Sequence, residues 1–93
     1  MEELEFEWDA EKARANARKH GVSFSEGAIV FGDRLARLMA ERTVDDERRQ
    51  VMVGLSALGR LLVVVFVDRG RIRIISTRRA TPFERNDHEE TRG

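Results

Sequence analysis

The chain has 93 residues, 37% of them charged and 41% hydrophobic. This composition predicts one small soluble domain, residues 1–93, with one core and a shallow site rather than a deep cofactor pocket. The absence of cysteine excludes disulfides, zinc fingers and thiol chemistry. No apolar run is long enough for a membrane span, and the acidic first residues do not resemble a signal peptide. We therefore expect a cytoplasmic protein that has no membrane segment.

The formal net charge is zero, from 17 basic and 17 acidic residues, but the charges are unevenly distributed. Residues 1–11 contain only acidic charges, whereas residues 60–85 contain seven arginines against Asp68 and Glu84. A polyanion responds to a patch within about a Debye length, ~8–10 Å, so the net charge does not exclude nucleic acid. The arginines either cover a solvated sheet face or form a binding surface.

The first quarter of the chain predicts a strand followed by two helices. Residues 4–8 alternate apolar and acidic side chains, as a half-buried strand does. Asp9 then caps a helix over residues 10–20, and Gly21 ends it. The alanines at 10, 13 and 17 are expected to face inward. Ser23 and Glu26 form a capping box for a second short helix, which ends at residues 32–33.

The middle of the chain contains one ambiguous segment. Residues 35–42 suit a helix by propensity, whereas their context favours a strand. Residues 43–49 are expected to form a polar loop. Residues 50–56 then form a strand that leads to a turn at Gly59.

The last third is more regular. Residues 61–67 are continuously apolar, which is typical of a central strand that is covered on both faces. A tight turn at residues 68–70 leads to a strand over residues 71–77, and Thr81 caps a helix that runs to about residue 90. The predicted fold class is therefore α+β, with an antiparallel sheet of three to four strands, two N-terminal helices and a short C-terminal helix.

The strand that begins at Arg71 leads to a pair of arginines. Strict alternation places Ile72, Ile74, Ser76 and Arg78 on one face and Arg71, Arg73, Ile75, Thr77 and Arg79 on the other. Because the first set begins apolar, we expect Arg78 at the rim of the core face. Both arginines precede a helix N-terminus, a position suited to phosphate.

Three further residues could take part in acid–base chemistry. Two of them have both a structural and a catalytic interpretation, and the third has only a structural one. His20 either caps the C-terminal end of its helix or acts as an acid or base beside Lys19. Glu84 is either half of a capping box or a carboxylate base that orients an arginine. His88, among acidic residues, is expected to lie on a solvated helix surface, and no set of metal ligands is visible.

Two separated motifs resemble a known family. The run Lys19-His20-Gly21-Val22-Ser23-Phe24 and the run Ile75-Ser76 followed by Arg78-Arg79-Ala80-Thr81 are similar to the BrnT toxins of bacterial type II toxin–antitoxin systems. The resemblance covers about residues 5–85. It implies a RelE-like fold, a ribonuclease that blocks translation, and neutralisation by a BrnA-like antitoxin that supplies dimerisation and operator DNA binding in a heterotetramer.

The resemblance suggests RNA cleavage that needs neither a metal ion nor a cofactor, because the ribose 2′-hydroxyl is the nucleophile. In this hypothesis Arg78 and Arg79 stabilise phosphate charge and His20 or Glu84 transfers the proton. The RNA backbone would be followed by four basic residues: Lys19, Arg60, Arg71 and Arg73. The alternative is a non-catalytic module that binds RNA or a partner within a transcriptional autorepressor complex.

Overall fold

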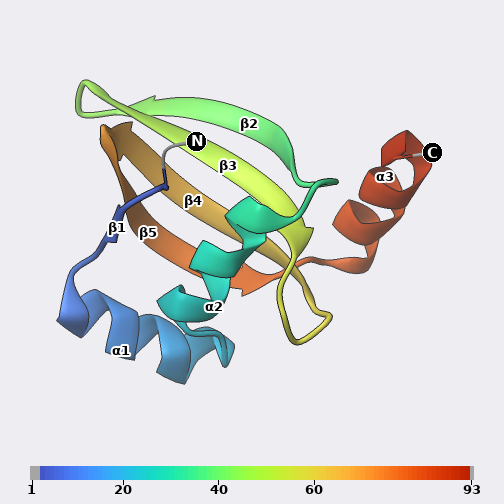
Figure 1. Ribbon diagram of the computed structural model, residues 1–93, viewed down its shortest axis with the longest axis horizontal. Coiled ribbons are helices and arrows are strands. Elements are labelled where there is room, and N and C mark those ends of the chain that lie inside the picture. Colours follow the sequence, from blue (N-terminus) through green and yellow to red (C-terminus); the bar gives the residue numbers. More distant parts are fainter. Residues whose placement is uncertain (1–2, 93) are drawn as a thin grey trace.

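The computed structural model describes residues 3–92, and in this part of the chain a five-stranded sheet forms the centre of the protein (Figure 1). Its strand order is β1-β5-β4-β3-β2. The strands are β1 (Phe6–Glu7), β2 (Arg37–Val44), β3 (Glu47–Leu55), β4 (Leu61–Arg69) and β5 (Arg71–Arg79). Strands β2 to β5 form the expected antiparallel meander, and β1 adds a parallel strand beside β5. The α+β prediction is confirmed, with the apolar strand β4 at the centre.

Two helices cover one face of the sheet (Figure 1). Helix α1 (Ala10–His20) is capped by the Asp9 carboxylate and ends at Gly21, whose φ of 69° is left-handed. Helix α2 (Phe24–Ile29) continues into the short 3-10 helix η1 (Val30–Gly32). Phe24 and Val30 pack against Leu62, Val64 and Ile74 to form the main core. We call this side of the sheet the helical face and the opposite side the open face.

The inward side of α1 differs from our prediction. Ala10 and Ala17 are exposed, and only Ala13 packs against the core. The buried residue of α1 is Asn16. Asn16, rather than an alanine, lies on the buried side of α1 because its side-chain amide forms hydrogen bonds with the edge of β5, as described below.

The hairpin between β2 and β3 replaces the predicted polar loop over residues 43–49. Strand β2 extends to Val44 and β3 begins at Glu47, so only Asp45 and Asp46 form the turn. Both have positive φ, 50° and 63°. This conformation matches a two-residue hairpin turn, which aspartate tolerates. The predicted loop, with Asp45, Asp46 and Glu47 at its tip, was too long because the polar residues on either side of the turn belong to the two strands.

The prediction that Arg78 lies at the rim of the core face was also wrong, because β5 contains a bulge. Val65 pairs with Ser76 and Phe66 with Ile74, which leaves Ile75 without a partner on β4. An extra residue shifts the side-chain alternation by one. Thr77 and Arg79 therefore continue the helical face beyond Ile74, and Arg78 lies on the open face opposite Val63.

The C-terminal helix α3 (Pro82–Arg92) is set apart from α1 and α2 (Figure 1). Thr81 and Glu84 form the predicted capping box, in which each side chain accepts a hydrogen bond from the other residue's amide. His88 is 3% exposed, so its predicted solvated position is wrong. It lines a small cavity with Leu38, Met39 and Val53, because α3 turns this side toward β2 and β3.

The acidic N-terminal segment neutralises part of the arginine-rich one. Strand β1 places Glu7 level with Arg73, and their side chains form an ion pair at 2.8 Å. Glu5 pairs with Arg71 at 3.1 Å. The parallel pairing of β1 and β5 thus brings the two oppositely charged regions of the sequence together. Among residues 3–92, no helix is long and apolar enough to cross a membrane.

Candidate functional site

A groove of about 460 Å³ runs along the open face of the sheet. Its apolar lining comes from strands β2 to β5 and includes Val51, Val63, Val65 and Ile75. The charged side chains that line it are three arginines and one glutamate: Arg42, Arg49, Arg78 and Glu84. An apolar surface flanked by guanidinium groups suits a ligand that has both flat apolar parts and anionic groups.

Arg78 and Glu84 form a bidentate ion pair in the groove. Nη1 and Nη2 of Arg78 each donate to one oxygen of the Glu84 carboxylate, both at 2.8 Å. The carboxylate also accepts from the Thr81 amide. These bonds, the one from Arg78 first, lower the pKa of Glu84 from 4.5 to about 2. Glu84 is therefore ionised at neutral pH, and it serves both as a capping-box residue and as the partner of Arg78.

Arg42 and Arg49 were missed by the sequence analysis. They face each other across the β2–β3 hairpin and both line the groove. Arg49 Nε lies 3.5 Å from Glu47, whose carboxylate also pairs with Arg69. Like charges directly opposite in a sheet repel each other, and a bound anion relieves that repulsion. The sequence could have revealed these residues only through the correct register of the β2–β3 hairpin. The prediction of a polar loop hid that register.

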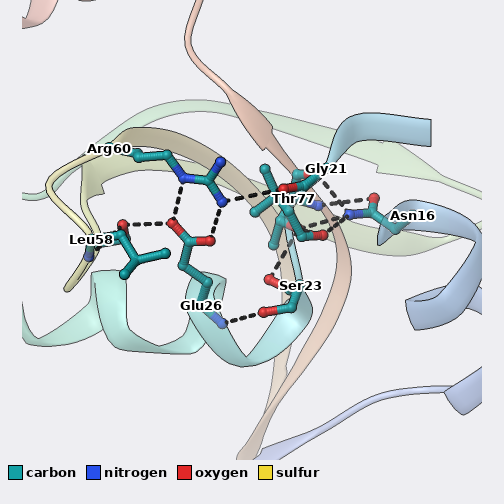
Figure 2. Close-up of polar contacts among 9 residues, drawn as sticks. Asn16, Gly21, Ser23, Glu26, Leu58, Arg60 and Thr77 are labelled. Atoms are coloured by element: carbon teal, nitrogen blue, oxygen red, sulfur yellow. Dashed lines mark hydrogen bonds and ion pairs between the residues drawn. The ribbon is translucent and has the colours of Figure 1, made fainter. Parts of the chain in front are cut away.

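The helical face carries a second polar cluster, built around Glu26 (Figure 2). The predicted capping box of α2 is half right: Ser23 accepts from the Glu26 amide, but the Glu26 carboxylate does not return to Ser23. It instead accepts from Arg60 Nε at 2.9 Å, from Arg60 Nη2, and from the Ser56 hydroxyl at 2.7 Å. The bond from Arg60 is the main cause of the lowered pKa of Glu26. Glu26 is 8% exposed, so this is a nearly buried carboxylate held ionised by an arginine.

Asn16 joins α1 to the end of β5 (Figure 2). Its side-chain oxygen accepts from the Thr77 amide, and its nitrogen donates to the Thr77 carbonyl. The same nitrogen donates to the Val22 carbonyl. The side chain thus replaces a neighbouring strand on the edge of β5, where β1 pairs only with Ile72 and Arg73. Sequence patterning missed this residue because an asparagine inside a helix is usually exposed.

The structure separates the residues that we proposed as catalytic. Arg78 and Glu84 meet at the groove, whereas Arg79 lies on the helical face. Lys19 and His20 lie at the end of α1, where Lys19 is exposed and His20 is half-buried. Gly21, which follows the helix, accepts a hydrogen bond from Arg60 on the helical face. Of the four proposed RNA-backbone residues, Arg60, Arg71 and Arg73 are each paired with a glutamate.

Comparisons with protein families and with solved structures agree with the α+β fold described above. A family model described as the ribonuclease toxin BrnT of type II toxin–antitoxin systems matches residues 8–84. The crystal structure of the Brucella abortus ribonuclease toxin BrnT superposes with a TM-score of 0.65 at 24% sequence identity, covering 85% of this chain and 99% of that one. No curated protein sequence matches the chain significantly. On the extent of the family match, the chain belongs to the BrnT family, the ribonuclease toxins of type II toxin–antitoxin systems.

Proposed function

We propose that the groove on the open face is the RNA-cleaving site, and that cleavage there needs no metal ion and blocks translation. The observation that carries this proposal is the convergence of three arginines, Arg42, Arg49 and Arg78, on one apolar groove. RNA has groups that complement both parts of the groove. Its phosphates can bind the guanidinium groups, and its bases or riboses can contact the apolar lining. Net charge on the groove is positive even after Glu84 is counted.

Cleavage in this site follows from the chemistry of RNA. The ribose 2′-hydroxyl loses its proton to water and attacks the adjacent phosphorus, the bond to the 5′-oxygen breaks, that oxygen takes a proton from water, and a 2′,3′-cyclic phosphate forms. Negative charge builds up on the phosphoryl oxygens, and preoriented guanidinium groups stabilise that charge more than water does. Arg78 is preoriented because Glu84 holds its two terminal nitrogens, while Arg78 Nε has no hydrogen-bond partner among the described residues.

Glu84 and His20 are the two proton-transfer groups that the sequence suggests. A carboxylate with a pKa of about 2 is a weak base, so we assign Glu84 the task of orienting Arg78. His20 ends α1 on the other side of the sheet from Arg78. We therefore assign the main catalytic effect in the groove to electrostatic stabilisation, and we expect His20→Gln to retain cleavage.

Replacement of Arg78 tests the groove directly. We expect Arg78→Ala to lower kcat for RNA cleavage by about 10²–10³, the usual effect of removing one oxyanion-stabilising group. Arg78→Lys should recover little activity because lysine cannot make the two parallel bonds to Glu84. The assay is cleavage of end-labelled RNA in EDTA, with the exposed Arg85→Ala on α3 as the matched control. Full activity of Arg78→Ala would place the reaction elsewhere.

A non-catalytic module is the alternative function. Purified protein that binds RNA but leaves it intact in EDTA, and again when Mg²⁺ is added, would support this alternative. Cleavage restored only by Mg²⁺ would keep the ribonuclease and reject metal independence. Induction in bacteria adds a second readout, because a translation-blocking toxin should arrest growth and amino-acid incorporation, and Arg78→Ala should relieve both.

A type II toxin has a cognate antitoxin. We propose that a BrnA-like antitoxin neutralises this protein in the cytoplasm, in a heterotetramer that reaches operator DNA only through the antitoxin. Light scattering of the co-expressed pair gives the stoichiometry. Operator binding by the pair, but not by the toxin alone, is the expected result.

A further inference from the structure

We propose that Arg60 and Arg79 form a second phosphate-binding site, on the helical face, which holds the RNA backbone beside the cleavage groove without taking part in cleavage. The inference rests on the proposed function for the identity of the ligand as RNA. Its location rests on the Glu26 cluster, which the groove does not use.

Arg60 is fixed by its contacts and still has donors to offer. Its Nε and Nη2 bind Glu26, and Nη2 also donates to the Gly21 carbonyl at 3.2 Å. Nη1 has no hydrogen-bond partner among the described residues, and Figure 2 shows one terminal nitrogen of Arg60 without a dashed contact. A guanidinium held on one edge presents its free edge at little entropic cost, which favours binding of an oxyanion.

Arg79 lies on the same face of the sheet as Arg60. It pairs with Leu62 across β4 and β5, and Arg60 precedes Leu62 by two residues, so both arginines face the helical side. The Arg79 charge is the smallest of the causes that act on the lowered pKa of Glu26, after the hydrogen bond from Arg60. Within residues 3–92 the exposed Arg79 guanidinium makes no hydrogen bond or ion pair of its own. The helical face therefore carries one arginine that Glu26 fixes and a second arginine that has no partner of its own among the described residues.

Stability alone does not account for this cluster. A nearly buried ion pair contributes little to folding, because desolvation offsets much of the attraction, and apolar replacements often do as well. The carboxylate does, however, fix Arg60 with its Nη1 unused by the described residues, and a preoriented guanidinium binds an oxyanion at a lower entropic cost. Lys19, near the end of α1 and two residues before Gly21, adds positive charge to the same end of the molecule.

The two sites can share one RNA strand. Arg78 and Arg79 are consecutive but point to opposite faces of β5. Beyond the two residues paired with β1, the outer edge of β5 has no neighbouring strand among the described residues. Asn16 of α1 occupies this edge at Thr77, so an RNA strand that leaves the groove at Arg78 would pass around the end of β5 beyond Thr77 to reach Arg79 and Arg60.

Binding of an uncleavable probe tests this inference separately from cleavage. The probe is a labelled single-stranded 2′-O-methyl oligoribonucleotide, which lacks the nucleophile, and the full chain is titrated by fluorescence anisotropy. We expect Arg79→Ala to raise Kd about tenfold and to reduce the salt slope of log K by about 0.7, the value for one lost phosphate contact. Arg60→Lys, which keeps a charge for Glu26, should raise Kd severalfold. The control Arg34→Ala removes an exposed arginine elsewhere and should leave Kd unchanged.

Cleavage kinetics and folding complete the test. With cleavable RNA, Arg79→Ala should raise KM at unchanged kcat, whereas Arg78→Ala should lower kcat. A thermal melt shows whether each variant is folded. Wild-type Kd and salt slope in both Arg79→Ala and Arg60→Lys, or no binding of the probe by the wild type, would overturn the second site. Binding that depends on Arg79 without any RNA cleavage would instead overturn the proposed function and leave the second site standing.

Discussion

At the scale of single residues, two glutamates that the sequence marks as helix caps have arginine partners. Glu84 keeps its capping role and also binds Arg78, whereas Glu26 gives up the reciprocal bond to Ser23 for Arg60. Both motifs look alike in sequence because a serine or threonine precedes a glutamate by three residues. An arginine far along the chain decides which role the carboxylate takes, and local spacing cannot reveal it.

The Glu84–Arg78 pair predicts a dependence of stability on pH. The pKa of Glu84 in the folded protein, about 2, lies below its ordinary 4.5. Its stabilisation is therefore complete above pH 4.5 and is lost as the pH falls toward 2. We expect Glu84→Gln to reduce the free energy of unfolding by about 1–2 kcal/mol at pH 7, after allowance for solvent screening of the half-exposed Arg78.

Urea unfolding of the wild type and Glu84→Gln over pH 7 to pH 2 measures this effect. The difference between the two proteins should shrink below pH 4.5. The control Glu89→Gln, exposed on the same helix, should show no such trend. A difference that stays constant down to pH 2 would contradict the ion pair.

At the scale of elements, two backbone features set which side chains face the groove. The two-residue turn at Asp45 and Asp46 places Arg42 opposite Arg49, and the bulge at Ile75 places Arg78 on the open face. Helix and strand types were predicted for most of the chain, because apolar periodicity and caps are local. The bulge was not predictable from alternation, since Ile75 is as apolar as Ile74 before it and either residue could face the core.

The contact of α2 with β5 gives a prediction at this scale. A Cβ at Gly27 would lie 2.2 Å from Thr77 Cγ2, and Thr77 is fully buried. We expect Gly27→Ala to lower the free energy of unfolding by about 1–2 kcal/mol, because overpacking outweighs the gain in helix propensity. The matched control is Gly32→Ala, where a Cβ meets no atom within 4 Å. Chemical denaturation measures the free energy of unfolding of both variants. A more stable Gly27→Ala would contradict the prediction, because it would show that α2 and β5 move apart enough to accept the added methyl group.

At the scale of the whole molecule, the charge sum of zero results from opposite regions that the fold brings together. Strand β1 holds Glu5 and Glu7 against Arg71 and Arg73, at one edge of the sheet. The groove arginines and Arg79 lie away from these acids. The positive surface is thereby concentrated on the groove and the end of β5 rather than spread along all of β5.

Removal of the acids on and next to β1 should expose the arginines that they mask. We expect the double variant Glu5→Gln/Glu7→Gln to bind single-stranded RNA about threefold more tightly at low salt, an effect that high salt abolishes. The double variant Glu89→Gln/Glu90→Gln changes net charge equally on exposed positions of α3 and serves as the control. Equal gains in both would show that only total charge matters and would contradict local masking.

The sequence by itself determined the α+β class, most of the helices and strands, the caps and the arginine-rich end of β5, because periodicity, caps and turn glycines act over a few residues. It also supported the family through two motifs at the right separation. Tertiary structure alone decided the face of each arginine, the buried roles of Asn16 and His88, and the pairing of Glu26 with Arg60. Those outcomes depend on a one-residue bulge and on contacts across up to 61 positions of sequence, which no local pattern encodes.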